Sequence, residues 1–184
     1  MSLSFILLFL ALVIIIAIII CYNQLVRKKN MMKEAWSGID VFLKKRYNLV
    51  PNLVRTVKGY TTHETQLLER ITALRTAAMQ STAVNERIAT ENELGKTISQ
   101  VFVFAENYPD LKANINFLEL QTQLGTIEGE IEMSRRYYNG TVRENNIAVE
   151  SFPAMLIARA FRFETGPFYE IEDKQQRESI NVSF

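Results

Sequence analysis

Hydrophobic residues fill the start of the chain and then recur at helical spacing through most of the rest. From Leu3 to Tyr22 the sequence contains one polar residue, Ser4, and no charged residue. Twenty helical residues, at about 1.5 Å each, cross the roughly 30 Å hydrocarbon core of a bilayer. No basic residue precedes this run and no A-x-A-like cleavage site ends it, so it indicates an uncleaved membrane anchor rather than a signal peptide. Positions representing the predicted transmembrane helix are Leu3, Phe5, Leu10, Ile15, Ile20 and Tyr22.

A second pattern, in which apolar residues alternate in steps of three and four, covers residues 36–78. This period is typical of helices packed as in coiled coils. Its phase is unchanged at Pro51 and Gly59, which favours one helix from the membrane to about residue 80, kinked at Pro51. The alternative is a break at Gly59–Thr62, where the sequence resembles a capping box. The seam positions are Trp36, Ile39, Leu43, Arg46, Val50, Leu53, Val57, Tyr60, Glu64, Leu67, Ile71, Leu74 and Ala78.

The remaining sequence predicts three further helices with short connections. They cover about residues 84–107, a stretch from Pro109 to about 149, and residues 154–161. The middle one has a seam of Phe117, Leu120, Leu124, Ile127, Ile131, Ser134, Tyr138, Thr141, Asn145 and Ala148, which becomes more polar towards its end. Short connections favour antiparallel neighbours, so the expected fold class is all-α. We expect a single N-terminal transmembrane helix followed by an elongated antiparallel up-and-down four-helix bundle with coiled-coil-like seams.

The expected organisation has four parts. These are a transmembrane anchor at 1–22, a basic juxtamembrane stalk at 23–35, the helical bundle at 36–168 and a C-terminal tail at 169–184. In that tail, apolar and polar residues alternate from Ile180 to Phe184, so we expect its end to make contacts.

Charge is divided unevenly along the chain. The net charge is +1, but residues 1–60 carry nine basic and two acidic groups (+7), whereas residues 61–184 carry twelve basic and eighteen acidic groups (−6). The cluster that directly follows the apolar run predicts an outside N-terminus and a cytoplasmic bundle, with attraction to anionic membrane lipids. The single cysteine, Cys21, excludes an intrachain disulfide and fits a reducing compartment. The basic groups are not interleaved with aromatic residues, so nucleic acid is not an expected partner. The juxtamembrane basic cluster is Arg27, Lys28, Lys29 and Lys33.

Residues 36–54 read WSGIDVFLKKRYNLVPNLV, followed by VKGY at 57–60 and HE at 63–64. This segment resembles the signature of the LemA family, and the resemblance continues at 108–111, 136–139 and 151–153. The resemblance implies a membrane-anchored helical protein of the bacterial inner membrane, whose biochemical activity is not established. Two departures from the family pattern are Asn48, in place of the usual Asp, and Arg162, where the family often has Gly.

Several motif positions are candidate interaction sites. They are Trp36, Asp40, Lys44, Arg46, Pro51, Asn52, Lys58, Tyr60, His63 and Glu64. His63 and Glu64 alone invite an enzymatic interpretation, but a zinc protease motif needs a second histidine four residues later, where the chain has Leu67 and no other histidine. We therefore expect no metal, no cofactor and no enzymatic activity, with Trp36 serving in packing.

Arg46 and Glu64 are the two charged residues of the first seam. They would lie about 27 Å apart in a straight helix, so each needs a partner on another helix, another subunit or water. Asp40 and Lys44 have the i,i+4 spacing of a favourable surface pair, worth a few tenths of a kcal/mol.

These patterns predict a cytoplasmic scaffold or assembly module that is anchored in the membrane and forms a homo-oligomer. Opposite charge on the two parts of the chain makes contacts between neighbouring copies attractive and sensitive to salt. The alternative is a signalling or adaptor protein that works with a membrane protease or a phosphatase-like partner, because proteins that resemble LemA are often encoded near such partners.

Overall fold

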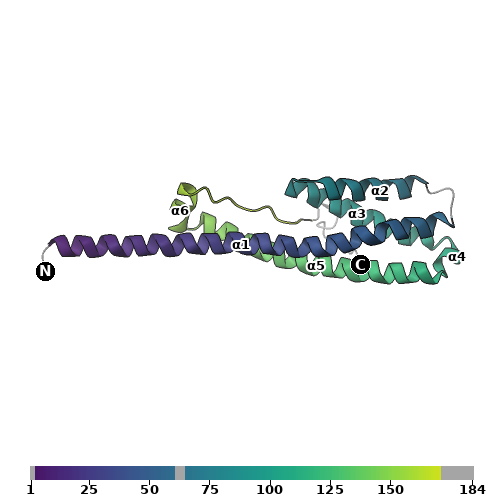
Figure 1. The fold of residues 1–184 in the computed structure, drawn as a ribbon, viewed down its shortest axis with the longest axis horizontal. Helices are drawn as coiled ribbons and strands as arrows, with labels where there is room; N and C mark the ends of the chain where they lie inside the picture. The colour runs from purple at the N-terminus through teal and green to yellow at the C-terminus, as the bar shows by residue number, and fades with distance from the viewer. Residues whose placement is uncertain (1–2, 61–64, 171–184) are drawn as a thin grey trace, which may run out of the picture. The chain divides into compact units, whose positions relative to one another are not determined.

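The computed structural model describes residues 3–60 and 65–170, and these residues form helices without any strand. The helices are α1 (Leu3–Lys58), α2 (Thr65–Gln80), α3 (Val84–Ala105), α4 (Pro109–Lys112), α5 (Ile115–Glu150) and α6 (Ala154–Ala160) (Figure 1). The all-α prediction is therefore confirmed. The four-helix count and the up-and-down order stay predictions.

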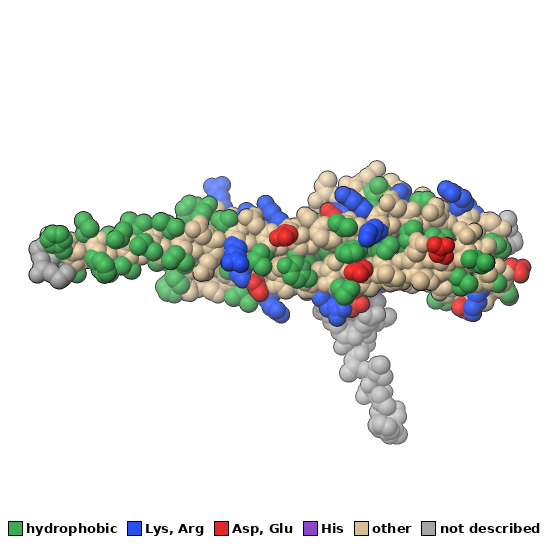
Figure 2. Space-filling view, turned by 60° about the horizontal axis from the view of Figure 1, so that its bottom comes forward, with side chains coloured by type: hydrophobic (Ala, Val, Ile, Leu, Met, Phe, Trp, Pro, Cys, Tyr) green, Lys and Arg blue, Asp and Glu red, His purple; other side chains and the backbone are tan. Residues whose placement is uncertain are grey.

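Helix α1 is 56 residues long and carries both the apolar stretch and the basic motif segment. Its N-terminal part exposes hydrophobic side chains on all sides, and Lys and Arg side chains occur only beyond that part (Figure 2). Among the described residues, α1 is the helix long and apolar enough to cross a membrane. Exposed apolar surface of this extent needs non-aqueous surroundings, so this part of α1 is a candidate membrane anchor.

The prediction of one helix to about residue 80 is wrong. Helix α1 passes through Pro51 without a break, as expected, but it ends at Lys58. The amides of Gly59 and Tyr60 then bond to the carbonyls three residues before them, which closes a tight last turn. The alternative break near Gly59 is therefore correct. The apolar repeat keeps its phase beyond Gly59 for another reason. Helix α2 turns back, and its apolar side chains again face the core.

Contacts between Cα atoms divide the chain into two compact units. Unit 1 comprises Met1–Val41 and Glu132–Phe168, and unit 2 comprises Phe42–Ile131 and Tyr169–Phe184. In unit 2, the second part of α1 packs with α2, α3, α4 and the first part of α5. The seam positions buried there are Leu43, Arg46, Val50, Leu53, Val57, Ile71, Ala78, Phe117, Leu120, Leu124, Ile127 and Ile131, whereas Tyr60 is exposed.

In unit 1, the first part of α1 packs against the second part of α5, α6 and an extended segment after α6. Buried residues of this unit are Leu25, Ala35, Ile39, Tyr138, Thr141, Val142, Asn145 and Ala158. Tyr138, Thr141 and Asn145, from the polar end of the second predicted seam, are thus buried within unit 1.

The remaining helix boundaries agree with the predictions except after Pro109. Helix α4 begins there but ends at Lys112, and α5 starts afresh at Ile115. The break has a local cause, because the side-chain oxygen of Asn114 accepts a hydrogen bond from the amide of Phe117 at 3.1 Å. Asparagine is a preferred N-cap for this reason.

Candidate functional site

A buried ionic cluster centred on Arg46 joins three helices of unit 2. Arg46 of α1 is only 2% exposed. Its Nη1 donates a hydrogen bond to Glu128 Oε1 of α5 at 2.7 Å, and its Nη2 donates to the carboxylate of Glu91 in α3. Nη2 also lies 3.3 Å from the backbone carbonyl oxygen of Glu91. Of the three possibilities that the sequence left open for Arg46, another helix, another subunit or water, the structure shows the first, because both partners lie on other helices of the same chain.

The electrostatics of the cluster keep Arg46 charged and Tyr47 neutral. Burial alone would lower the pKa of Arg46, but the carboxylates of Glu128 and Glu91 outweigh burial and raise it. The hydroxyl of Tyr47 donates to the second carboxylate oxygen of Glu91. Burial, followed by this hydrogen bond, raises the pKa of Tyr47 well above its ordinary value of 10.0. The cluster therefore links the helices through fixed polar contacts.

Gly95 makes room for the guanidinium group. A Cβ atom at this position of α3 would lie 3.3 Å from Nη1 of Arg46 and 3.8 Å from Oε2 of Glu128. The first distance is tighter than most Cβ contacts in proteins, so a larger residue would require the guanidinium group to move by a few tenths of an ångström.

Sequence reasoning missed the acidic partners of Arg46. Glu91 lies three residues after Ile88 and three before Leu94, on the apolar face of α3. The available signal for this pairing was a carboxylate on the apolar face of α3, together with an arginine in the apolar seam of α1. Glu128 follows the seam residue Ile127 and gave no comparable signal.

Pro51 leaves one carbonyl of α1 without its helical partner, and Arg75 supplies the replacement. Proline has no N–H, so the carbonyl of Tyr47, four residues earlier, loses its intrahelical bond. Nε of Arg75 in α2 donates to this carbonyl oxygen at 2.8 Å. The family motif proline is thereby linked to the docking of α2 on α1.

An extended C-terminal strap, residues 163–168, is tied to α5 in unit 1. Asn145 Nδ2 donates to the carbonyl of Glu164 at 3.2 Å, and the Tyr138 hydroxyl donates to the carbonyl of Pro167 at 2.9 Å. These bonds explain why the seam of α5 becomes polar where it meets the strap. A Cβ atom at Gly166 would overlap Sδ of Met32, so a larger residue in the strap would require the Met32 side chain to shift. Burial also raises the pKa of Tyr138.

At the end of the apolar stretch, aromatic and basic residues of unit 1 lie close together. The ring of Tyr22 is 4.9 Å from that of Phe161 and 5.7 Å from that of Phe163, with edge-on geometry. Lys29 Nζ lies 5.5 Å from the centroid of Phe163, a cation–π distance. Of the other predicted basic residues, Arg27 and Lys33 are exposed.

Lys28, the remaining member of the basic cluster, pairs with Glu144 of α5. This hydrogen bond from Lys28 lowers the pKa of Glu144. Part of the juxtamembrane positive charge is therefore neutralised within unit 1.

The other motif residues lie apart from the ionic cluster. Trp36 is half-buried with its ring 5.2 Å from that of Tyr138, which fits the predicted packing role. Tyr60 is exposed, and its hydroxyl accepts a hydrogen bond from Nδ2 of Asn114 at 2.7 Å. Asp40 is half-buried and Lys44 is exposed, and their pairing stays a prediction.

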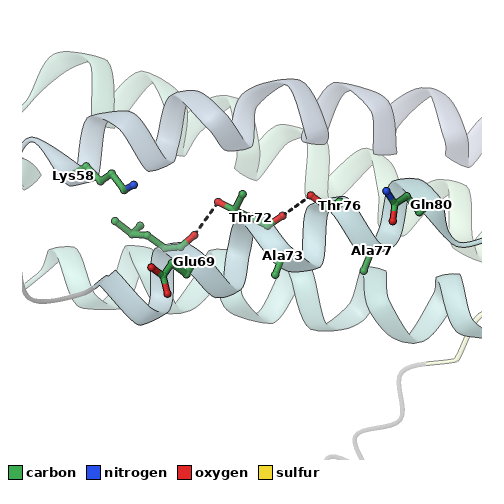
Figure 3. A pocket seen from close by; sticks show the side chains of 8 residues that line it. Lys58, Glu69, Thr72, Ala73, Thr76, Ala77 and Gln80 are labelled. Carbon is green, nitrogen blue, oxygen red and sulfur yellow. Dashed lines mark hydrogen bonds between the residues drawn. The ribbon is translucent and has the colours of Figure 1, made fainter.

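Two open hollows in unit 2 include motif residues. One, of about 460 Å³, includes Asn52 in its lining, and the other, of about 610 Å³, runs along α2 beside Lys58 (Figure 3). In the larger hollow, the hydroxyls of Thr72 and Thr76 bond to carbonyls of their own helix at 3.0 and 2.9 Å. The lining thus combines small side chains and already engaged hydroxyls with the polar side chains of Lys58, Glu69 and Gln80.

His63 and Glu64 lie outside the described residues. Within residues 3–60 and 65–170, no group of three or more His, Cys, Asp or Glu side chains is placed to hold a metal ion.

The fold and these sites define an all-helical protein with an N-terminal candidate membrane anchor. The sequence model of the LemA family matches residues 35–184. The chain therefore belongs to the LemA family. Protein LemA of Metamycoplasma hominis is 28% identical over 142 residues, which cover 74% of this chain and 63% of that protein. The chain thus spans less than two thirds of the length of this curated relative.

Proposed function

We propose that the protein is a helical scaffold or assembly module, anchored in the bacterial inner membrane, and not an enzyme. The observation that carries this proposal is the use of buried and part-buried polar groups. Arg46, Glu91 and Glu128 connect helices, and Asn145 and Tyr138 hold the strap. Their hydrogen bonds join these groups to one another and to backbone atoms, as expected of parts that stabilise a shape, while Nε of Arg46 and Oδ1 of Asn145 have no hydrogen-bond partner among the described residues.

In this proposal α1 crosses the membrane with its N-terminus outside and the remaining helices in the cytoplasm. The proposal is supported by the exposed apolar part of α1 and by the basic residues that follow it. Protease added to intact spheroplasts should leave the helical part undigested. Complete digestion would contradict this orientation.

A matched pair of variants tests the cause of the orientation. Replacing Arg27, Lys28, Lys29 and Lys33 by Gln should mix or invert it. The control replaces Lys44, Lys45, Arg55 and Lys58, which removes the same charge from positions more than 20 residues beyond Tyr22. This variant should keep the membrane orientation, because the positive-inside rule acts within about 15–20 residues of the span.

We also propose that the scaffold is a homo-oligomer in which copies contact one another through oppositely charged parts of the chain. The uneven charge, +7 and −6, supports this, as does exposed apolar surface in unit 2 at Val103 and Ile115. Arg46 does not support it, because its partners lie in its own chain.

Light scattering on the full-length protein in mild detergent, at low and high salt, is the test. A defined particle at low salt that dissociates at high salt is expected. A monomer at both salts would contradict assembly and leave the adaptor function as the better explanation.

A further inference from the structure

We propose that α6 and its flanking residues form a second membrane contact, which inserts into the headgroup boundary of the bilayer beside the end of the apolar stretch of α1. The ligand is the lipid surface itself. This inference rests on the proposed anchoring of α1. It adds that the helical part is held against the membrane rather than extended away from it.

The first observation is the position of α6 in unit 1. Tyr22 is the last residue of the apolar stretch, where tyrosine is typical of the membrane–water boundary. Its ring contacts Phe161, directly after α6, at 4.9 Å, and Phe163 at 5.7 Å. These contacts fix the end of α6 at the height along α1 where the bilayer ends, and Figure 1 shows α6 beside α1.

The second observation is the composition of α6. Its sequence is AMLIARA, so Arg159 is its single polar residue. Ala158 is buried against unit 1, yet Leu156 is 57% exposed and so faces away from that contact. Apart from Arg159 the helix carries no polar side chain, and a helix with so little polar surface is normally buried or in contact with lipid. The inner face of α6 is covered by the protein, and its outer face is not.

The third observation is that the exposed apolar surface continues on both flanks of α6. Phe152, just before the helix, is 79% exposed, and Phe161, just after it, is 58% exposed. Phenylalanine and leucine on the apolar face of an interfacial helix are buried among headgroups and upper acyl chains. The location beside the apolar stretch favours lipid over another protein as the occupant.

Charge contributes little to this contact. Arg159 and Arg162 are exposed and suited to anionic headgroups, but Glu150 and Glu164 in the same segment are exposed as well. Because the charges of this segment balance, α6 itself should add little dependence on salt or on anionic lipid to that of the basic cluster on α1.

Tryptophan emission in vesicles with brominated acyl chains tests the proposal on the full chain. The background is Trp36→Phe, which removes the single native tryptophan. Leu156→Trp reports on α6, Leu10→Trp on the anchor and Met133→Trp on a matched exposed position of unit 1. Tyr138 packs on Trp36, and Trp36 lies about 21 Å beyond Tyr22 along α1. Met133 comes before Tyr138 in α5, so it serves as a control position away from the end of the apolar stretch.

Brominated lipid should quench the tryptophan at 10 and at 156 several-fold more than that at 133, at low and high salt alike. Phe152→Trp, at a position outside any helix, should be quenched like 156 and provides a second reporter should 156 perturb α6. Circular dichroism on each variant checks that the fold is retained.

The other outcomes overturn the proposal in distinguishable ways. Quenching at 10 but at neither 152 nor 156 would overturn the contact of α6 and leave the anchor intact. Absence of quenching at all three positions would overturn the anchor as well. Protection of 156 from a water-soluble quencher without quenching by lipid would assign this face to a second copy of the chain.

Discussion

Nε of Arg75 donates a hydrogen bond at 2.8 Å to the backbone carbonyl of Tyr47, the carbonyl that Pro51 leaves without its helical donor. A side chain of α2 therefore completes the backbone bonding of α1. This relationship gives the motif proline a structural role, because Arg75 bonds to the carbonyl that the proline leaves without a donor.

The first prediction is that Pro51 and Arg75 are energetically coupled. Arg75→Ala should cost about 1–3 kcal/mol, the penalty for a part-buried carbonyl left unpaired. In a Pro51→Ala background the alanine amide can bond to Tyr47, so the same change should cost clearly less. Denaturant unfolding of the four proteins in detergent measures the coupling. Equal costs in both backgrounds would show that Arg75 acts independently of the proline.

A second prediction concerns the Arg46 cluster. Arg46→Ala leaves the buried carboxylate of Glu91 without its cation and should cost about 3–5 kcal/mol. The control is Arg70→Ala, which removes a pair with Glu93 whose side chains are 56% and 39% exposed, and should cost below about 1 kcal/mol. Thermal unfolding followed by circular dichroism compares them. Similar losses in both variants would contradict the structural role of the buried cluster.

Tyr47 gives the third prediction, a loss of stability in alkali. Its pKa in the folded state is raised above 10.0 by burial and by the hydrogen bond to Glu91. Above pH 10 the unfolded chain releases this proton first, so the stabilising contribution, full at lower pH, is lost as pH rises towards the folded-state pKa. Tyr47→Phe should show a shallower decline between pH 9 and 11, roughly the range over which unfolded tyrosine titrates. Tyr137→Phe, at an exposed position, is the control and should decline as the wild type does.

The fourth prediction concerns the strap of unit 1. Asn146 exchanges two hydrogen bonds with Gly166: its Nδ2 donates to the Gly166 carbonyl at 3.0 Å, and its Oδ1 accepts from the Gly166 amide at 2.8 Å. Asn146→Ala should cost about 1–3 kcal/mol and speed hydrogen exchange at the amide of Gly166. Asn92→Ala, which loses one bond to an exposed carbonyl, should leave that amide unaffected. Unchanged exchange in Asn146→Ala would show that the strap is held by other contacts.

Much of the core was predictable, because burial follows the seam. Leu53 and Ile71 are fully buried, as their positions in the apolar repeat predict. The break between them was only the alternative interpretation, for a physical reason. Periodicity reports which face of a helix is buried, and it has the same phase whether the chain continues or folds back onto the same core.

The partners of buried polar residues were less accessible to sequence reasoning. Arg46 was recognisable as a charge in a seam, but Glu91 and Glu128 lie 45 and 82 residues away along the chain. Pairing across such separations depends on the tertiary fold, which a one-dimensional repeat does not specify. The strap bonds of Asn145 and Asn146 were missed for the same reason.

Arg162, one of the two departures from the family pattern, is the subject of the last prediction. It has φ of +55°, in the left-handed region that favours glycine. It follows the end of α6, where the amide of Phe163 bonds to the carbonyl of Ala158 at 2.9 Å and that of Arg162 approaches the carbonyl of Arg159 at 3.4 Å. This is the Schellman pattern, whose left-handed position is usually glycine.

Arg162→Gly should therefore stabilise the protein by about 0.5–1 kcal/mol, since relief of the left-handed strain exceeds the added entropy of the unfolded chain. The matched control is Arg159→Gly, inside α6, where glycine should destabilise by about 0.5–1 kcal/mol. Both arginines are exposed and each variant removes one positive charge, so the difference between the two variants reports on the backbone conformation. Unfolding in detergent should give opposite shifts for the two variants, and a loss of stability in both would show that the Arg162 side chain contributes more than its backbone strain costs.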